Sequence, residues 1–94
     1  MLNVTSAARE CLLSKLNRKN VAEDVAMRFM RKERGWRLRP DRAGPADTAF
    51  TYEGRNVLVL DEAVSKAMAN MELDVRATEA GPRLRLRRIT KRSR

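Results

Sequence analysis

Histidine is missing from this 94-residue sequence, and cysteine occurs only once, at Cys11. Without histidine, the chain cannot form a Ser-His-Asp or Cys-His catalytic arrangement. A zinc site of the Cys/His type or a metal cluster held by one chain needs several such ligands. The composition therefore excludes these sites within a single chain, and one cysteine cannot form an internal disulfide. We expect neither a metal site nor a cofactor.

Long apolar runs and aromatic residues are also scarce. No stretch approaches the roughly 20 apolar residues that a membrane-spanning helix needs, and the first residues lack the basic and apolar segments of a secretory signal. We therefore expect no membrane contact and a cytoplasmic location. Aromatic residues make up 4% of the chain and hydrophobic residues 43%, which predicts one domain with an aliphatic core.

Two segments of the chain are strongly basic. The chain has a net charge of +9, from 21 basic and 12 acidic residues. Residues 31–42 carry six basic residues against two acids, and residues 81–94 carry seven basic residues and no acid. The rest of the chain is mildly acidic, with eight basic residues and ten acids. This asymmetry favours a polyanionic partner.

Hydrophobic periodicity predicts an α+β domain that is mainly β, with antiparallel strands in small packed sheets. We expect residues 1–89 to form this single domain and residues 90–94 to be a flexible basic tail. Helices are expected over about residues 6–18, after an N-cap at Thr5, and over residues 62–70, after a cap at Asp61. Alternating apolar residues predict strands within residues 24–32, 34–41, 49–52, 56–60, 71–78 and 83–89.

Three local signals refine this expectation. Pro40 should end its strand or mark it as an edge strand, because proline has no amide hydrogen for a central ladder. Gly54 can adopt the positive φ that a tight hairpin turn needs. The continuous apolar run at residues 57–60 favours a strand that is central or buried on both faces.

The order of these segments resembles the HesB/IscA family, the A-type proteins of iron–sulfur cluster biogenesis. The resemblance implies a HesB-like domain and runs through most of the chain. The matching stretches are "VTSAARECLLSKL", "AMRFMRKERGWRLRPD", "DTAFTYEGRNVLVLDEAVSKAM" and "LDVRATEAGPRLRLRR".

The cluster-binding cysteines of that family have no counterpart here. The family typically has one cysteine after the first strand, before a small residue, a glycine and an aromatic residue. Glu33 stands in that position, followed by Arg34, Gly35 and Trp36. The family's Cys-x-Cys pair near the C-terminus is absent, and Cys11 matches none of the three positions. Cluster iron needs soft thiolate ligands, so the comparison implies a divergent member that has lost its cluster ligands.

The sequence supports two interpretations of function. The first is a non-catalytic HesB/IscA-like protein related to iron–sulfur cluster assembly, acting as an accessory or interaction module that binds an acidic protein of that machinery. The second is a small basic protein that binds RNA or DNA through loop 31–42 and strand 83–89, combining phosphate contacts with base stacking. The sequence predicts no particular oligomeric state and no enzymatic activity.

Both interpretations use the same candidate residues for contact with an anionic partner. Trp36 is the ambiguous member. It could stack on a base, or it could pack into the core, because it lies on the same side of its strand as Leu38. The candidates are Arg31, Lys32, Arg34, Trp36, Arg37, Arg39, Arg83, Arg85, Arg87 and Arg88.

Overall fold

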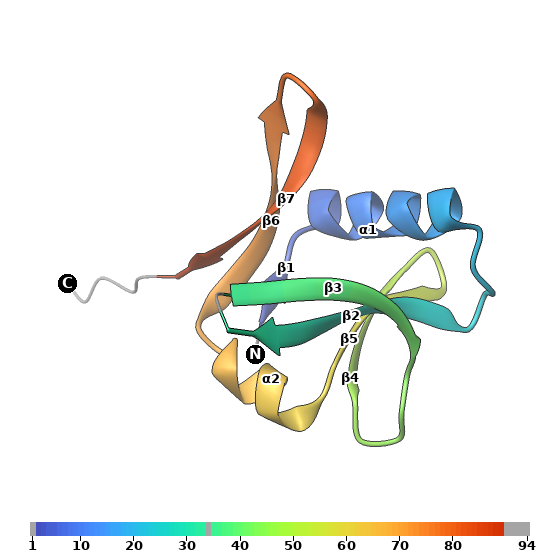
Figure 1. The fold of residues 1–94 in the computed structure, drawn as a ribbon, viewed down its shortest axis with the longest axis vertical. Coiled ribbons are helices and arrows are strands. Elements are labelled where there is room, and N and C mark those ends of the chain that lie inside the picture. The colour runs from blue at the N-terminus through green and yellow to red at the C-terminus, as the bar shows by residue number, and fades with distance from the viewer. Residues whose placement is uncertain (1, 34, 90–94) are drawn as a thin grey trace.

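Two small β-sheets and two helices form the fold in the computed structural model, which describes residues 2–33 and 35–89 (Figure 1). Residue 34 and the predicted tail at 90–94 lie outside the described residues. The elements follow in the order β1 (Asn3–Val4), α1 (Ser6–Lys19), β2 (Val25–Lys32), β3 (Gly35–Arg42), β4 (Thr48–Tyr52), β5 (Arg55–Leu60), α2 (Glu62–Ala67), β6 (Met71–Thr78) and β7 (Gly81–Arg88).

The strands form one sheet in the order β3-β2-β5-β4 and another in the order β1-β6-β7. The predicted mainly-β class with two helices is confirmed, but the sheets are mixed rather than antiparallel throughout. β2 runs parallel to β5, and β1 runs parallel to β6. Each hairpin is antiparallel within itself, and its sequence does not specify the direction in which a second hairpin packs beside it.

Helix α1 forms where the helical spacing of apolar residues predicts it. The hydroxyl of Thr5 accepts a hydrogen bond from the amide of Ala8 at 3.1 Å, which satisfies one exposed donor of the first turn. Ala8, Leu12 and Leu16 are fully buried on the inner side of the helix. Burial of this apolar stripe holds α1 against the sheets.

The second helix is capped as predicted, with Asp61 accepting a hydrogen bond from the amide of Val64 at 2.8 Å. Val64 and Met68 are buried, whereas Ala63 and Ala67 are exposed. The helix is only six residues long, so few of its side chains can pack against the core.

Strand β5 lies between β2 and β4, and residues 57–60 are completely buried, as the apolar run predicts. The preceding hairpin turn places Glu53 at φ 54° and Gly54 at φ 78°. Two successive positive φ values are typical of the type I′ turn, which matches the twist of the strands it joins. The expected positive φ of Gly54 is confirmed.

Strand β3 continues through Pro40 to Arg42 and lies at the edge of its sheet. The prediction that Pro40 marks an edge strand is therefore confirmed, because only an edge position can leave one side of the ladder without a donor.

In the described part of the chain, no helix is long and apolar enough to cross a membrane.

Candidate functional site

The two basic segments of the sequence border a single apolar hollow between the two sheets. The hollow has a volume of about 320 Å³. Strands β3 and β7 are the edge strands on either side of it. The fold therefore brings together two segments that are separated by 38 residues in the sequence. The hollow is lined by Phe29, Trp36, Leu38, Leu73, Leu84 and Leu86.

Trp36 is half-buried and packs toward the core from β3. Its ring meets that of Phe29 edge-on, with 6.3 Å between the centroids and 70° between the planes. The guanidinium carbon of Arg31 lies 5.3 Å from the Trp36 centroid, within the range of a cation–π contact. Packing with Phe29 and the contact with Arg31 both occupy the indole, so the structure favours the core interpretation of Trp36 over base stacking.

The cationic side chains divide between two faces of each hairpin. Arg31 pairs in register with Trp36 and shares its face, and Arg88 shares the face of Leu86. These two cations therefore belong to the faces that border the hollow. Alternation places five arginines of the two edge strands on the opposite faces: Arg37 and Arg39 on β3, and Arg83, Arg85 and Arg87 on β7.

Several arginines are already neutralised by carboxylates. Arg28 donates hydrogen bonds to Asp41 at 2.8 Å and to Asp47, and its side chain is only 16% exposed. Arg87 donates to Glu72 through two nitrogens, at 2.9 and 2.7 Å. Arg87 was among the predicted anion contacts, and the structure shows that an acid of its own hairpin already pairs with it.

These contacts shift the pKa values of the carboxyl groups. The hydrogen bond from Arg28 lowers the pKa of Asp47, and the amide of Gly44 lowers it further. The pKa of Asp74 is lowered by the Val75 amide and by the Thr5 hydroxyl, which donates at 2.9 Å. Asp47 and Asp74 are therefore charged at neutral pH and tie loops to strands.

Other arginines have no such partner. Within residues 2–33 and 35–89, the guanidinium groups of the edge-strand residues Arg37, Arg39 and Arg83 form no hydrogen bond or ion pair, and neither does Arg76 on β6. Arg76 was missing from the sequence-based candidates. It lies directly opposite Arg83 in the β6–β7 ladder, a pairing that a two-residue turn at residues 79–80 would have predicted.

The donor set does not fit an iron–sulfur cluster. Cys11, the only thiol of the sequence, lies on α1, whereas Glu33, at the position where the family typically has its first cysteine, follows the end of β2. Among the residues that the structure describes, no group of three or more histidine, cysteine, aspartate or glutamate side chains could hold a metal ion. A hard carboxylate with cationic neighbours is a poor ligand for cluster iron.

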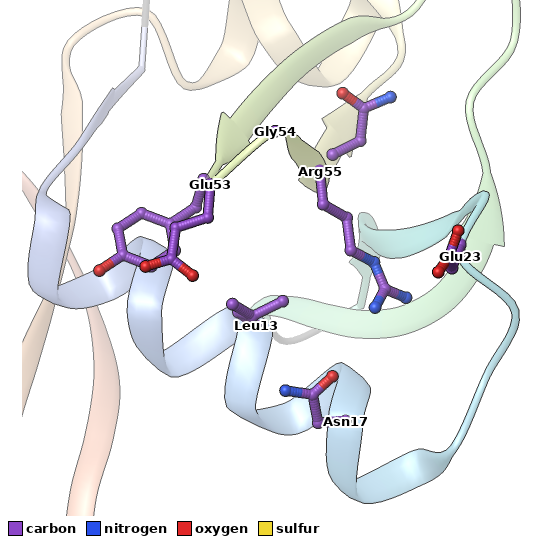
Figure 2. Close-up of a pocket in the computed structure, with 8 residues that line it drawn as sticks. Leu13, Asn17, Glu23, Glu53, Gly54 and Arg55 are labelled. Atoms are coloured by element: carbon purple, nitrogen blue, oxygen red, sulfur yellow. The ribbon is translucent and has the colours of Figure 1, made fainter.

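A second hollow of about 580 Å³ separates α1 from the β4–β5 turn. Figure 2 shows Leu13 and Asn17 of α1 facing Glu53, Gly54 and Arg55. Nη2 of Arg55 donates to the carbonyls of Ala22 at 3.0 Å and of Val25 at 3.2 Å. Arg55 therefore fixes the segment that joins α1 to β2, and the other lining groups form no catalytic arrangement.

Comparisons with known proteins find similarity in structure and none in sequence. No family model and no curated protein sequence matches the chain. The crystal structure of Escherichia coli SufA, which is involved in biosynthesis of iron–sulfur clusters, is similar with a TM-score of 0.72 at 17% identity, over 93% of this chain and 84% of SufA. The crystal structure of IscA with the [2Fe-2S] cluster gives a TM-score of 0.61 at 17% identity, over 94% and 85% of the two chains.

These two structures confirm the predicted fold. The chain shares the fold of SufA and IscA along nearly its whole length. It differs from a cluster-holding protein in its donor set, which contains one thiol.

Proposed function

We propose that this protein is a non-catalytic relative of the A-type proteins that has lost cluster binding and docks an acidic protein partner of the iron–sulfur assembly machinery. The fold shared with SufA and IscA supports the link to that machinery. The observation that carries the docking role is the apolar hollow between β3 and β7, bordered by the two basic segments.

The chemistry of this hollow suits a protein segment. Leucine and aromatic side chains line it, and apolar pockets of this kind receive the anchor residues of protein interfaces. Arg31 and Arg88 lie on the same faces and are exposed, so they can pair with acids that flank an apolar anchor. The partner we infer therefore presents an apolar side chain between aspartate or glutamate residues.

A second copy of the chain is a poorer occupant of this site. It would bring the same arginines to the interface, and the juxtaposition of like charges costs free energy and suppresses association. Strands β3 and β7 also carry rows of arginine, which disfavour edge-to-edge pairing between copies.

Affinity purification at low salt, followed by mass spectrometry, tests this function. The wild-type protein should recover proteins of the iron–sulfur assembly machinery, and the variant Arg31→Glu/Arg88→Glu should lose them. The matched control Lys15→Glu/Arg18→Glu reverses two charges on α1 and should retain them. Recovery of only ribosomal proteins or RNA, or equal loss in both variants, would contradict the proposal.

A further inference from the structure

The β6–β7 hairpin carries a second cationic feature, separate from the apolar hollow. Figure 1 shows its distal half extending beyond α1 and away from the four-stranded sheet. Residues 76–80 at the end of β6 and in the turn are exposed, as are Pro82 and Arg83 of β7. This half of the hairpin is free to enter a groove of another molecule.

The charges on one face of the hairpin change from its base to its tip. At the base, Glu72 faces Arg87 in register and forms an ion pair with it, with 2.7 Å between the atoms. In the middle, Asp74 faces Arg85, and at the tip Arg76 faces Arg83. Like charges directly opposite each other destabilise a ladder, so the fold does not account for the arrangement at the tip.

No acid compensates for the arginines at the tip. Glu79, in the turn, forms no ion pair with either Arg76 or Arg83 in the described chain. The hydroxyl of Thr78 donates to the carbonyl of Gly81 at 2.6 Å and accepts from the amide of Ala80 at 3.2 Å, so it holds the turn. Arg76 and Arg83 face each other, and Arg85 faces Asp74 without an ion pair to it in the described chain. The three guanidinium groups thus supply donors around a hollow of about 400 Å³.

We propose that this arginine tip, defined as Arg76, Arg83 and Arg85, binds the phosphate backbone of duplex DNA. The proposal goes beyond the docking function and does not depend on it. Guanidinium forks fit phosphate oxygens bidentately, and the chain has 16 arginines against five lysines. A two-stranded β-ribbon fits the major groove of B-DNA, which is about 12 Å wide.

The absence of aromatic side chains from the lining of the tip hollow favours duplex DNA over other polyanions. Besides the arginines, the tip hollow is lined by Ala77, Thr78 and Leu84, with no aromatic residue. Single-strand binding relies on aromatic stacking, and protein interfaces rely on buried aromatic or apolar anchors. The deep, narrow major groove of duplex RNA excludes side chains. Duplex DNA read through its phosphates is the ligand that remains.

Fluorescence anisotropy with a labelled 20-base-pair DNA duplex tests the proposal on the full chain. The variant Arg76→Gln/Arg83→Gln/Arg85→Gln should bind at least about tenfold more weakly at low salt, and its log–log salt slope should be shallower by about 2 to 3, since each lost phosphate contact contributes about 0.9. The control Lys15→Gln/Arg18→Gln/Lys19→Gln removes the same charge from α1 and should change affinity less than about twofold. Both variants keep residues 90–94, so the basic residues there contribute equally.

A thermal melt accompanies each variant. The tip variant should melt close to the wild type, because relief of the like-charge pair Arg76–Arg83 offsets loss of the opposite-charge pair Asp74–Arg85. Three results would overturn the proposal. These are no binding of the wild type to the duplex at low salt, equal loss of affinity in the two variants, and tighter binding to single-stranded DNA, duplex RNA or polyglutamate than to duplex DNA.

Discussion

Arg28 of the four-stranded sheet and the arginines of the hairpin tip have opposite surroundings. Arg28 on β2 bonds to Asp41, Asp47 and the carbonyl of Arg42. Arg76 and Arg83 face each other at the exposed end of the hairpin with no carboxylate bonded to them in the described chain. The same residue type thus stabilises a loop in one region and leaves donors free in the other. Net charge alone does not distinguish the two roles.

The largest effect we expect comes from removing a carboxylate that Arg28 needs. Asp47 has a 9% exposed side chain and also accepts from the amide of Gly44 at 2.6 Å. Asp47→Ala should lower the free energy of unfolding by about 2–3 kcal/mol, because it leaves a largely buried guanidinium without its main partner. Urea denaturation measures this change.

Asp41→Ala is the matched control, since Asp41 bonds to the same arginine but its side chain is 56% exposed. It should cost less than about 1 kcal/mol. Equal losses in the two variants would show that burial does not set the strength of this network.

Acid should weaken the four-stranded sheet through the same residues. The hydrogen bond from Arg28 lowers the pKa of Asp47, so the unfolded chain takes up this proton at a higher pH than the folded chain. The stabilisation is complete above the unfolded pKa of about 3.9 and is lost as the pH falls through the lower folded value. Urea midpoints should therefore fall below about pH 4, and Asp47→Asn should flatten this fall. An unchanged profile in Asp47→Asn would assign the acid sensitivity to other groups.

The smallest effects should differ in sign along one face of the hairpin. Arg87→Thr at the base breaks the ion pair with Glu72 and should lower the melting temperature slightly. Arg76→Thr at the tip relieves a like-charge pair and should stabilise by about 0.2–0.5 kcal/mol. Thermal melts of the two single variants measure this difference. A loss of stability in Arg76→Thr would mean that the tip arginines support the fold.

Local features of the fold could be predicted from the sequence because neighbouring residues determine them. Thr5 and Asp61 cap the helices that follow them, and Gly54 adopts the positive φ of its turn. The parallel pairing of β2 with β5 could not be predicted in this way, since it depends on how two hairpins pack. The correct overall class came from the order of segments, which matches the shared fold.

The sequence identified the two basic segments that border the candidate site, but not the apolar hollow between them. The two basic segments were identified, yet alternation on the strands separates Arg31 and Arg88 from Arg37, Arg39, Arg83 and Arg85. Arg34 lies outside the described residues, and Glu72 neutralises Arg87. Arg76 was missed because it lies outside the basic segments. Only the register of the β6–β7 ladder shows that it lies opposite Arg83.

The central claim is that this chain keeps the fold of SufA and IscA without holding a cluster. Anaerobic incubation with iron and sulfide, followed by desalting and measurement of bound iron and visible absorption, tests it most directly. The chain has one thiol, and cationic residues flank Glu33, so we expect no retained iron and no charge-transfer bands. Stoichiometric iron with those bands would contradict the claim.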